Sequence, residues 1–314
     1  MLRIIRSKRP FLQFGARVVV LDGGMAHTHD GIDWAERIPQ MRRADELNAS
    51  TYAVVAKRLT SDLPEGAVVV DVGSGTGGMS AALASVLAER GGGKLLLVDA
   101  VPELLSVAAD AARGAIETSR VEIETVVADL AHDDLRDLLP PAQLIWAASM
   151  VHHLPDQQAA VAGLARALAT DGMLSLAEGG LETQCLPWDL GVGEPGLERR
   201  LLTAHSEWFC EMRAEMPGAV RMPYGWNVAL GRAGLADVNA FSVLLDLPAP
   251  PSDALRAYVT HRLRWLVEMA SERLAAEDRR TADRLLDPDD SEFVGRRDDL
   301  YLLGAYTVHS GVLR

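Results

Sequence analysis

The sequence predicts an α/β protein in which helices cover both faces of a parallel sheet. From about residue 67, short apolar runs alternate with helical stretches, and this order is typical of a parallel sheet. Continuous apolar runs supply the strands, as expected of strands buried on both sides. A glycine-rich turn follows the first run. The expected strands are Ala67–Val72, Lys94–Asp99, Val121–Val127, Gln143–Ala148 and Met173–Glu178.

The helical stretches between these strands have apolar residues at three- and four-residue spacing. Examples are Met79–Arg90 and Gln157–Ala169, and Gly172 of Thr170-Asp171-Gly172 is expected to end the latter at a C-terminal turn. A further helix is expected upstream, over Met41–Leu59.

The last third of the chain differs from this pattern. Ala236–Leu247 and Leu300–His309 are expected to form two longer strands, separated by about fifty mostly helical residues. A long insertion between the fifth and sixth strands, residues 179–231, holds a concentration of aromatic residues that suit a substrate cap. They are Trp188, Trp208, Tyr224 and Trp226.

Charge and composition narrow the range of partners. The net charge of −13 argues against nucleic acid, since phosphates are bound mainly by Lys and Arg. No apolar run approaches the roughly 18–20 residues of a membrane span. Two cysteines are too few for a disulfide framework and fit a reducing cytoplasm. We therefore expect a cytoplasmic protein, monomeric or homodimeric, without a nucleic-acid or membrane partner.

The glycine-rich turn lies between a strand and a helix. Turns of this kind bind a ligand in several classes of protein. Gly73, Gly75, Gly77 and Gly78 allow a tight turn with close backbone approach, and the free N–H groups of the next helix suit an anionic group. The glycines alone do not identify the ligand. Gly73, Gly75 and Gly78 also satisfy G-x-G-x-x-G, and Asp99 follows at the distance of the ribose acid in a dinucleotide site.

Carboxylates at the ends of three successive strands favour a different ligand. Asp71 precedes the turn and suits an ammonium group, whereas a pyrophosphate would gain nothing from its charge. Asp99 suits ribose hydroxyls, and Asp129 suits an adenine amino group. Together they favour a ligand rich in hydrogen-bond donors.

These residues resemble the class I S-adenosylmethionine (SAM)-dependent methyltransferase family. D-V-G-S-G-T-G at 71–77 resembles its first motif, L-V-D-A at 97–100 its ribose-binding motif, and A-D-L at 128–130 its adenine-binding motif. S-M-V-H-H-L-P-D at 149–156 is similar to a segment of many small-molecule members. The resemblance covers roughly residues 45–180.

The resemblance implies a Rossmann-like, seven-stranded sheet whose last strand is antiparallel and inserted beside the fifth. It also implies a SAM-binding core over residues 45–180, preceded by an arm and possible lid at 1–44. A substrate cap over 181–231 and C-terminal strands over 232–314, with a helical insertion at 252–298, would complete the chain. The residues that would hold the methionine part, ribose and adenine of SAM are Asp71, Gly73, Ser74, Gly75, Thr76, Gly77, Asp99, Ala100, Asp129, Leu130 and Ser149.

Two histidines after the fourth strand are candidate general bases. His152 and His153 are adjacent, so they are not expected to share one helical face, and one of them is expected to reach the substrate. Some small-molecule members of the family have a histidine and an acid at the places of His152 and Glu178. We therefore favour His152 as the base, supported by Glu178.

The predicted function is methyl transfer from SAM to an oxygen or nitrogen atom of a small molecule, such as a natural product. A peptide or protein acceptor, an NAD-dependent dehydrogenase, and a SAM-binding protein that transfers no methyl group remain alternatives. No cluster of Asp, Glu and His has metal-ligand spacing, so no metal is expected.

Overall fold

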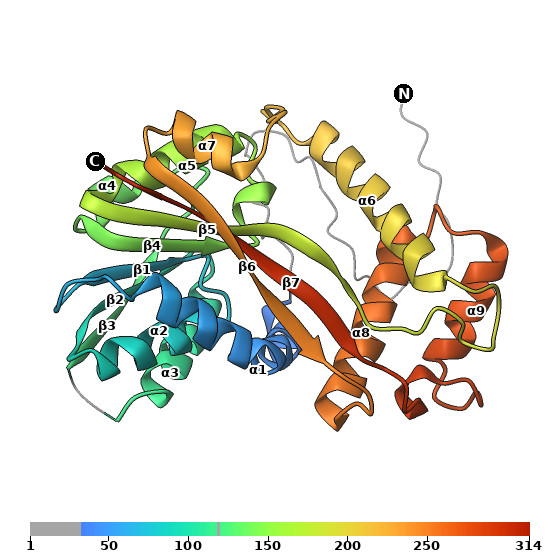
Figure 1. Ribbon diagram of the computed structural model, residues 1–314. Helices are drawn as coiled ribbons and strands as arrows, with labels where there is room; N and C mark the ends of the chain where they lie inside the picture. Colours follow the sequence, from blue (N-terminus) through green and yellow to red (C-terminus); the bar gives the residue numbers. More distant parts are fainter. Residues whose placement is uncertain (1–32, 118–119) are drawn as a thin grey trace. The chain divides into compact units, whose positions relative to one another are not determined.

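The structure is a computed structural model that describes residues 33–117 and 120–314. Within these residues, seven strands form one sheet in the order β3-β2-β1-β4-β5-β7-β6, and β7 is antiparallel to both neighbours (Figure 1). The predicted sheet, with its last strand antiparallel beside the fifth, is confirmed. The strands are β1 (Val68–Val72), β2 (Gly93–Asp99), β3 (Val121–Val127), β4 (Ala142–Ala148), β5 (Leu168–Gln184), β6 (Ala236–Leu247) and β7 (Leu302–Val312).

The helices lie in the connections between these strands and upstream of β1. Residues 1–32, most of the expected N-terminal arm, lie outside the described residues. The helices are α1 (Trp34–Leu59), α2 (Gly78–Glu89), α3 (Pro102–Gly114), α4 (Leu135–Leu138), α5 (Gln157–Arg166), α6 (Leu197–Glu215), α7 (Trp226–Arg232), α8 (Asp253–Ala270) and α9 (Ala276–Leu286), with short 3₁₀ turns η1 (Val151–His153) and η2 (Val294–Arg296).

Each face of the sheet has its own hydrophobic core. Because successive strand residues point to opposite faces, Val69 packs with α1, α2 and α3, whereas Val70 packs with α4, α5 and α7 (Figure 1). Trp146 on β4 is among the largest fully buried side chains and belongs to the first of these cores. The two-sided burial explains why the central strands β1, β2 and β4 are mainly apolar.

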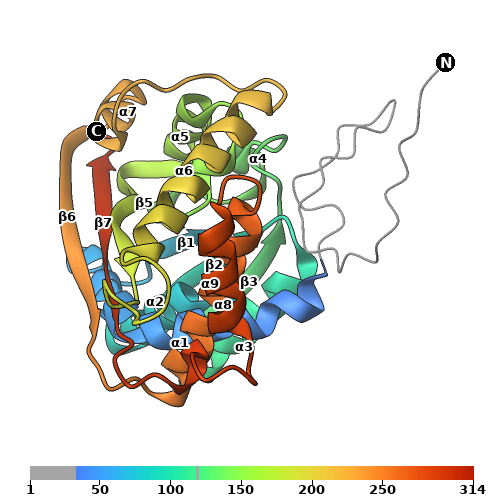
Figure 2. The ribbon, with the colours of Figure 1, turned by 90° about the vertical axis from the view of Figure 1, so that its right-hand side faces the viewer.

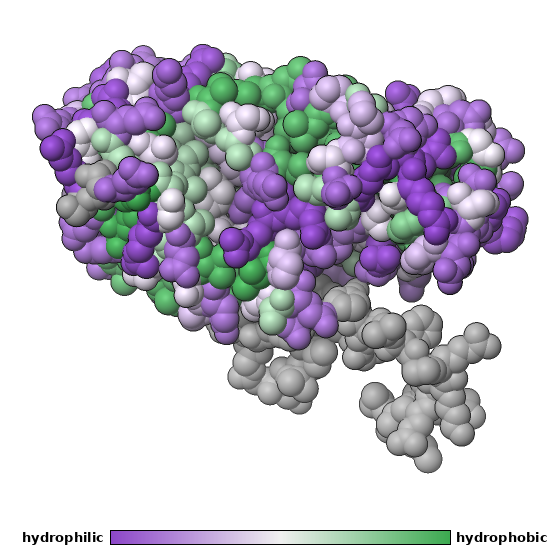
Figure 3. All heavy atoms as spheres, turned by 90° about the horizontal axis from the view of Figure 1, so that it is seen from below, coloured by the Kyte–Doolittle hydropathy of each residue, from purple (hydrophilic) through white to green (hydrophobic). Residues whose placement is uncertain are grey.

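A third core lies among helices that belong to the two long insertions. Cys185, Leu201 of α6, Leu263 of α8 and Leu285 of α9 are buried in it together with Leu302 at the start of β7. Figure 2 shows α6, α8 and α9 side by side as one layer. The predicted cap was assigned to residues 181–231 alone, but its helix α6 packs with the helices of the insertion at 252–298. Seen from below, the right-hand side of the molecule, where Figure 1 places α8 and α9, is mainly hydrophilic (Figure 3).

Two predicted helix boundaries were wrong. Helix α5 ends at Arg166 rather than at Ala169, because Leu168 already pairs with Ala142 of β4. A Cβ on Gly172 would lie 2.5 Å from the Ala142 carbonyl oxygen, so this glycine permits close approach of the strands and does not cap a helix. Helix α1 begins at Trp34, seven residues before the predicted start, and includes Pro39. Pro39 is the sixth residue of this helix, and it has no N–H to donate to the carbonyl oxygen four residues earlier, yet the helix continues past it.

The strand register aligns the carboxyl ends of the central strands. Val72 pairs with Val98 of β2 and with Ala147 of β4. Ala148 pairs in turn with Ala177 of β5. The segments that follow β1, β2 and β4 therefore begin at one edge of the sheet, level with the middle of β5. Ligands of open α/β sheets bind at this edge, near the reversal in strand order.

Candidate active site

The glycine-rich turn leaves β1 and curls over the end of β2. The N–H groups of Gly73 and Ser74 donate to the Val98 carbonyl oxygen, at 2.7 and 3.1 Å. Gly73, Gly75 and Gly77 have φ values of 70°, 54° and 88°, in the left-handed region that glycine adopts without strain. The glycines at these three positions are therefore required by the backbone itself.

Asp99, at the end of β2, contacts the glycine loop through one carboxylate oxygen and the segment after β2 through the other. Its Oδ2 accepts from the Gly75 N–H at 3.0 Å, and its Oδ1 accepts from the Val101 N–H at 3.0 Å. Ala100 next to it is half-buried. The predicted ribose-binding residues thus lie directly beside the glycine loop.

Asp129 follows β3 at the same edge of the sheet. Its Oδ1 accepts from the Ala131 N–H at 2.9 Å, and its own N–H donates to Asp133 at 2.8 Å. Asp129 and Leu130 are half-buried. Their predicted contact with adenine stays a prediction, and the turn around them is well fixed by these bonds.

Asp71 lies beneath the loop rather than on its surface. The residue is 2% exposed, and its Oδ2 accepts from the Ser80 hydroxyl at 2.5 Å. Burial raises the pKa of Asp71 to about 7, the Ser80 bond opposes this shift, and the charges of Asp45 and Asp99 add to it. The predicted contact with an ammonium group stays a prediction. What the structure shows directly is that Asp71 ties β1 to the first turn of α2.

Asp45 on α1 was not singled out in the sequence, and it contacts the loop from above. Its Oδ2 accepts from the Thr76 hydroxyl at 2.5 Å and from the Gly78 N–H at 3.1 Å. A Cβ on Gly78 would lie 2.5 Å from the Asp45 carboxyl carbon, so glycine is needed there for the approach of α1. The carboxylate occupies the start of α2, where an anionic ligand group would otherwise bind.

Ser149 follows β4 with an unusual backbone conformation. Its φ is 53°, which is uncommon for a residue other than glycine, and its N–H donates to the Ala177 carbonyl oxygen at 3.0 Å. Such strained residues cluster at functional sites. Ser149 is exposed, and Met150 after it packs 3.0 Å from the position that a Cβ on Gly73 would take. The segment after β4 thus adjoins the glycine loop.

Glu178 on β5 holds this segment and one of the two histidines. Its Oε1 accepts from the N–H groups of Met150 and Val151, at 3.0 and 2.8 Å. Its Oε2 is hydrogen-bonded to Nδ1 of His152. The Glu178 side chain is fully buried, whereas that of His152 is 28% exposed. A buried carboxylate therefore fixes the orientation of a histidine that reaches the surface, as in catalytic sites where an acid orients a base.

The two histidine rings lie side by side, contrary to the expectation that they point to different faces. Their centroids are 4.1 Å apart, and Phe209 of α6 lies against both, at 5.7 and 6.0 Å. The segment is one 3₁₀ turn rather than part of an α-helix, so the α-helical spacing does not apply. The bond to Glu178 is what distinguishes His152 from its neighbour.

Helix α6 is fixed at both ends across this pair. At its start, buried Glu198 accepts from the N–H groups of Cys185 and Leu186, at 2.9 and 3.0 Å. Near its end, Arg213 donates to the carbonyl oxygens of Leu154 and Pro155, at 2.5 and 3.2 Å. Phe209 is thereby held over the histidines, and α6 forms one wall of the candidate site.

The aromatic residues of the predicted cap do not all gather in one place. Trp208 and Trp265 pack with His205, at centroid distances of 5.5 and 4.7 Å. Tyr224 and Trp226 instead pack against the core on the α5 and α7 face of the sheet. The predicted aromatic pocket stays a prediction, and Trp208 is the member of the 179–231 set that lies on α6 itself.

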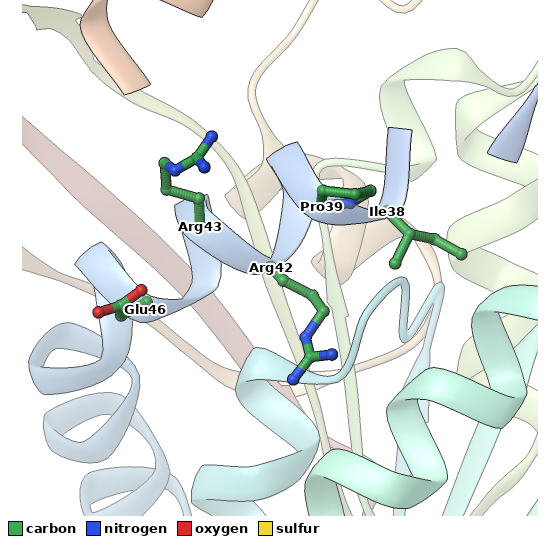
Figure 4. Close-up of a pocket in the computed structure, with 5 residues that line it drawn as sticks. All are labelled: Ile38, Pro39, Arg42, Arg43 and Glu46. Atoms are coloured by element: carbon green, nitrogen blue, oxygen red, sulfur yellow. The ribbon is translucent and has the colours of Figure 1, made fainter. Parts of the chain in front are cut away.

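A cavity of about 530 Å³ opens beside the first turns of α1. Figure 4 shows its lining residues, and in it Arg42 and Arg43 leave the helix in opposite directions. Met41, between Pro39 and Asp45, lies 3.4 Å from the position of a Cβ on Gly75. The lining residues are Ile38, Pro39, Arg42, Arg43 and Glu46.

Two further findings concern metals and membranes. Among residues 33–117 and 120–314, no group of three or more His, Cys, Asp and Glu side chains is arranged to hold a metal ion. Nor does the described part of the chain contain a helix with the length and apolar character to cross a membrane.

Comparison with known proteins gives the following matches. Residues 70–174 match a family model described as a methyltransferase domain. No curated protein sequence matches the chain significantly. The YcgJ protein of Bacillus subtilis is similar in structure at 18% identity and a TM-score of 0.48, over 84% of this chain and 98% of that one.

Two other solved structures are also similar to this chain. Phosphoethanolamine N-methyltransferase 2 of Haemonchus contortus, solved with phosphomonomethylethanolamine and S-adenosylhomocysteine, is 16% identical with a TM-score of 0.45, over 84% of this chain and 52% of that one. The [4+2]-cyclase SpnF is 14% identical with a TM-score of 0.41, over 86% and 81%.

Proposed function

We propose that this chain, whose residues 70–174 match a methyltransferase domain, is a SAM-dependent methyltransferase that methylates an oxygen or nitrogen atom of a small-molecule acceptor. In this proposal His152 is the general base and Glu178 orients it. The observation that carries the proposal is the bond from buried Glu178 to His152 at the edge of the sheet where the glycine loop lies.

The residues around the loop fit a cationic ligand. Asp45 and Asp99 each accept a hydrogen bond from the loop backbone, and the charges of both act on Asp71. SAM carries a sulfonium and an ammonium group, and it supplies an activated methyl group when bound. Gly73, Ser74, Gly75, Thr76 and Gly77 would hold its methionine part with Asp71, and Ser149 would lie nearby. Ala100 with Asp99, and Leu130 with Asp129, would hold ribose and adenine.

The role of His152 follows from its hydrogen bond. In the proposed state Nδ1 donates to Glu178, so Nε2 carries the free lone pair. Nε2 then accepts the proton of the acceptor hydroxyl or ammonium group as the methyl group is transferred. A base in this position contributes roughly 10²–10⁴-fold to such reactions, and alignment of the acceptor contributes further. Phe209 limits how the acceptor can approach Nε2, since it covers both histidine rings.

An NAD-dependent dehydrogenase is the alternative from another enzyme class, and Asp45 disfavours it. A dinucleotide pyrophosphate binds at the N-terminus of the helix after the glycine turn. In this chain the Gly78 N–H at that position donates to the Asp45 carboxylate. A pyrophosphate would therefore meet a negative charge and a donor that is already used.

Two further alternatives share the cofactor but differ in the reaction. One is a peptide or protein acceptor, and the other is a SAM-binding protein that transfers no methyl group. Incubation with methyl-labelled SAM and panels of small-molecule and peptide acceptors separates these alternatives by which product, if any, carries the label.

Replacement of the two histidines tests the mechanism. We expect His152→Ala to lower turnover by about 10²–10⁴-fold with SAM affinity unchanged, because the base would be lost and the loop would not. His153→Ala, which leaves the bond to Glu178 intact, should cost far less. Calorimetric titration with SAM and NAD(H), with initial rates for each variant, provides the measurement. Binding of NAD(H) without SAM, or a turnover loss confined to His153→Ala, would contradict the proposal.

A further inference from the structure

Arg262 of α8 is a largely buried cation whose hydrogen bonding is incomplete. Its side chain is 13% exposed. Nη2 donates to the Thr183 carbonyl oxygen at 2.9 Å and lies 3.9 Å from Glu182, whose own side chain is 64% exposed. Nε is buried and has no hydrogen-bond partner among the residues that the structure describes. A buried donor of a charged group is costly without an acceptor, and a ligand that supplies one would remove this cost.

Two buried polar groups near the third core are engaged with each other and do not complete the bonding of Arg262. Glu198 accepts from the N–H groups of Cys185 and Leu186, and also from the Cys185 thiol at 3.1 Å. Burial and the Glu198 charge raise the pKa of that thiol, against the opposing charge of Arg262, so the thiol is neutral. Neither group supplies an acceptor for the Arg262 Nε.

Tyr258, Arg262 and Trp265 share one face of α8, because they are four and three residues apart. Burial raises the pKa of the Tyr258 hydroxyl, and the Arg262 charge opposes this shift. The hydroxyl therefore keeps its proton at neutral pH and can donate it in a hydrogen bond. This face of α8 combines a cation, a neutral donor and an apolar ring.

Aromatic contacts connect this face of α8 with the proposed base. His205 of α6 packs against Trp265, and the charges of Glu182 and Arg262 both act on the His205 ring. Phe209, one turn later on the same face of α6, lies against His152. Figure 2 shows α6 and α8 side by side. An apolar body of a ligand could therefore lie against α6 between Arg262 and His152.

Strand β5 gives the length of that ligand. Glu178 on β5 binds His152, and Thr183, five residues later on the same strand, accepts from Arg262. At about 3.3 Å per residue these two positions are about 16 Å apart along the strand. In Figure 1, β5 runs from the sheet towards α8. A molecule that reaches both Arg262 and His152 is therefore elongated.

We propose that Arg262 and the Tyr258 hydroxyl bind a carboxylate or phosphate group of the acceptor. The acceptor is then an elongated molecule with an anionic end at α8, an apolar body against the aromatic rings of α6, and the methylated atom at His152. Both anions can accept from two N–H groups of one guanidinium. This inference rests on the proposed function and deepens it by naming the class of acceptor.

Binding of three probes that share one apolar chain tests the anion site. The probes are decanoate, decyl phosphate and the neutral decanol, each titrated calorimetrically into the full chain. We expect Arg262→Gln to weaken binding of the preferred anion by about 10- to 100-fold, the usual loss for a hydrogen bond between charged groups. Decanol affinity should change by less than about twofold. The anion that the unchanged protein binds more tightly identifies the group as carboxylate or phosphate.

Variants on the same helix separate a specific contact from a general effect of charge. Arg264 has the same charge, is exposed and lies two residues further on, so it faces away from Arg262. Arg264→Gln should leave all three affinities within about twofold. Arg262→Lys should recover part of the loss, and Tyr258→Phe should weaken anion binding by about 2- to 10-fold. Thermal unfolding confirms that each variant folds, and the preferred anion should raise the unfolding temperature of the unchanged protein but not of Arg262→Gln.

Turnover connects the anion site with the acceptor. Hydroxy- and amino-substituted fatty acids and their methyl esters are incubated with methyl-labelled SAM. We expect the free acid to be preferred over its ester. In Arg262→Gln this preference should disappear through a higher KM for the acid with kcat little changed, because Arg262 binds the acceptor at a distance from the reacting atoms.

Several results would overturn the inference. Decanol bound as tightly as both anions, equal losses for all three probes in Arg262→Gln, or an equal loss in Arg264→Gln would each remove Arg262 from this role. Label transfer to acids and esters alike would reject the anionic acceptor while methyl transfer stands. Anion binding that depends on Arg262 in a protein that does not bind SAM would instead reject the proposed function.

Discussion

Glu178 performs two tasks that one substitution separates. Its Oε1 accepts from two backbone N–H groups, of Met150 and Val151, and its Oε2 binds Nδ1 of His152. In Glu178→Gln the amide oxygen can still accept from both N–H groups, but the amide nitrogen then faces Nδ1 as a donor. Nδ1 must accept, so the proton of the neutral ring moves to Nε2. The fold is expected to persist, and the base is expected to be lost.

The size of the effect follows from these contacts. Loss of a general base lowers kcat by about 10²–10⁴-fold, or about 3–5 kcal/mol in activation free energy. Glu178→Ala should also destabilise the fold by about 2–6 kcal/mol, since it leaves two buried N–H groups without an acceptor, at about 1–3 kcal/mol each. Glu178→Gln keeps an acceptor for them, so its free energy of unfolding should remain closer to that of the unchanged protein.

The assay combines rates, binding and unfolding for both variants. Initial rates with methyl-labelled SAM give kcat, calorimetry gives the affinity for SAM, and urea unfolding gives stability. We expect Glu178→Gln to lose turnover while it keeps SAM affinity and most of its stability. Wild-type turnover in Glu178→Gln would refute the orienting role. A loss of SAM affinity as large as the loss of turnover would show that the glycine loop, and not His152, had been disturbed.

Two further predictions concern stability around the glycine loop. Because the pKa of folded Asp71 is raised to about 7, the folded protein holds a proton that the unfolded chain releases near pH 4. The stabilisation that the protonated Asp71 gives to the folded state is therefore complete below pH 4. It is lost as pH rises towards 7, at no more than about 1.4 kcal/mol of unfolding free energy per pH unit. Asp71→Asn should flatten the dependence of the unfolding free energy between pH 5 and 7, and an unchanged slope would count against the burial argument. Gly78→Ala should cost about 1–3 kcal/mol in urea unfolding, since its Cβ would lie 2.5 Å from Asp45 and 2.7 Å from Tyr52. Gly114→Ala, with open space at that position, is the control, and equal stability of the two variants would contradict the close approach of α1.

The sheet was predictable because its strands carry their own pattern. Each of the seven predicted strands overlaps a strand of the structure, and the bounds of Val121–Val127 and Ala236–Leu247 agree with it. The ends of β5 and β7 were harder to predict. Beyond Glu178, β5 continues through a polar segment that only its pairing with β7 makes a strand. Sequence patterns do not record such pairing between distant segments.

The candidate site was predictable where it follows strand ends, and less so elsewhere. Asp99 and the glycines lie where the strand–turn–helix pattern puts them, and Glu178 does contact His152. Asp45 could not be found in this way, because its role depends on how α1 crosses the loop. One trace of it exists in the sequence. The turn itself does not require glycine at position 78, and the structure explains Gly78 by the Asp45 side chain that lies above it.

The third hydrophobic core has a consequence for how this protein can evolve. The side chains that bury Leu201, Leu263 and Leu285 are distinct from those that pack α1–α3 and α4, α5 and α7 on the sheet. Substitutions in separate cores tend to add rather than to interact. The helical layer that contributes Phe209 can therefore change much of its packing separately from the sheet, and its link to the glycine loop is α1, whose Leu47 packs against this core two residues after Asp45. Such a division would let one half of the molecule acquire new specificities while the other half stays the same.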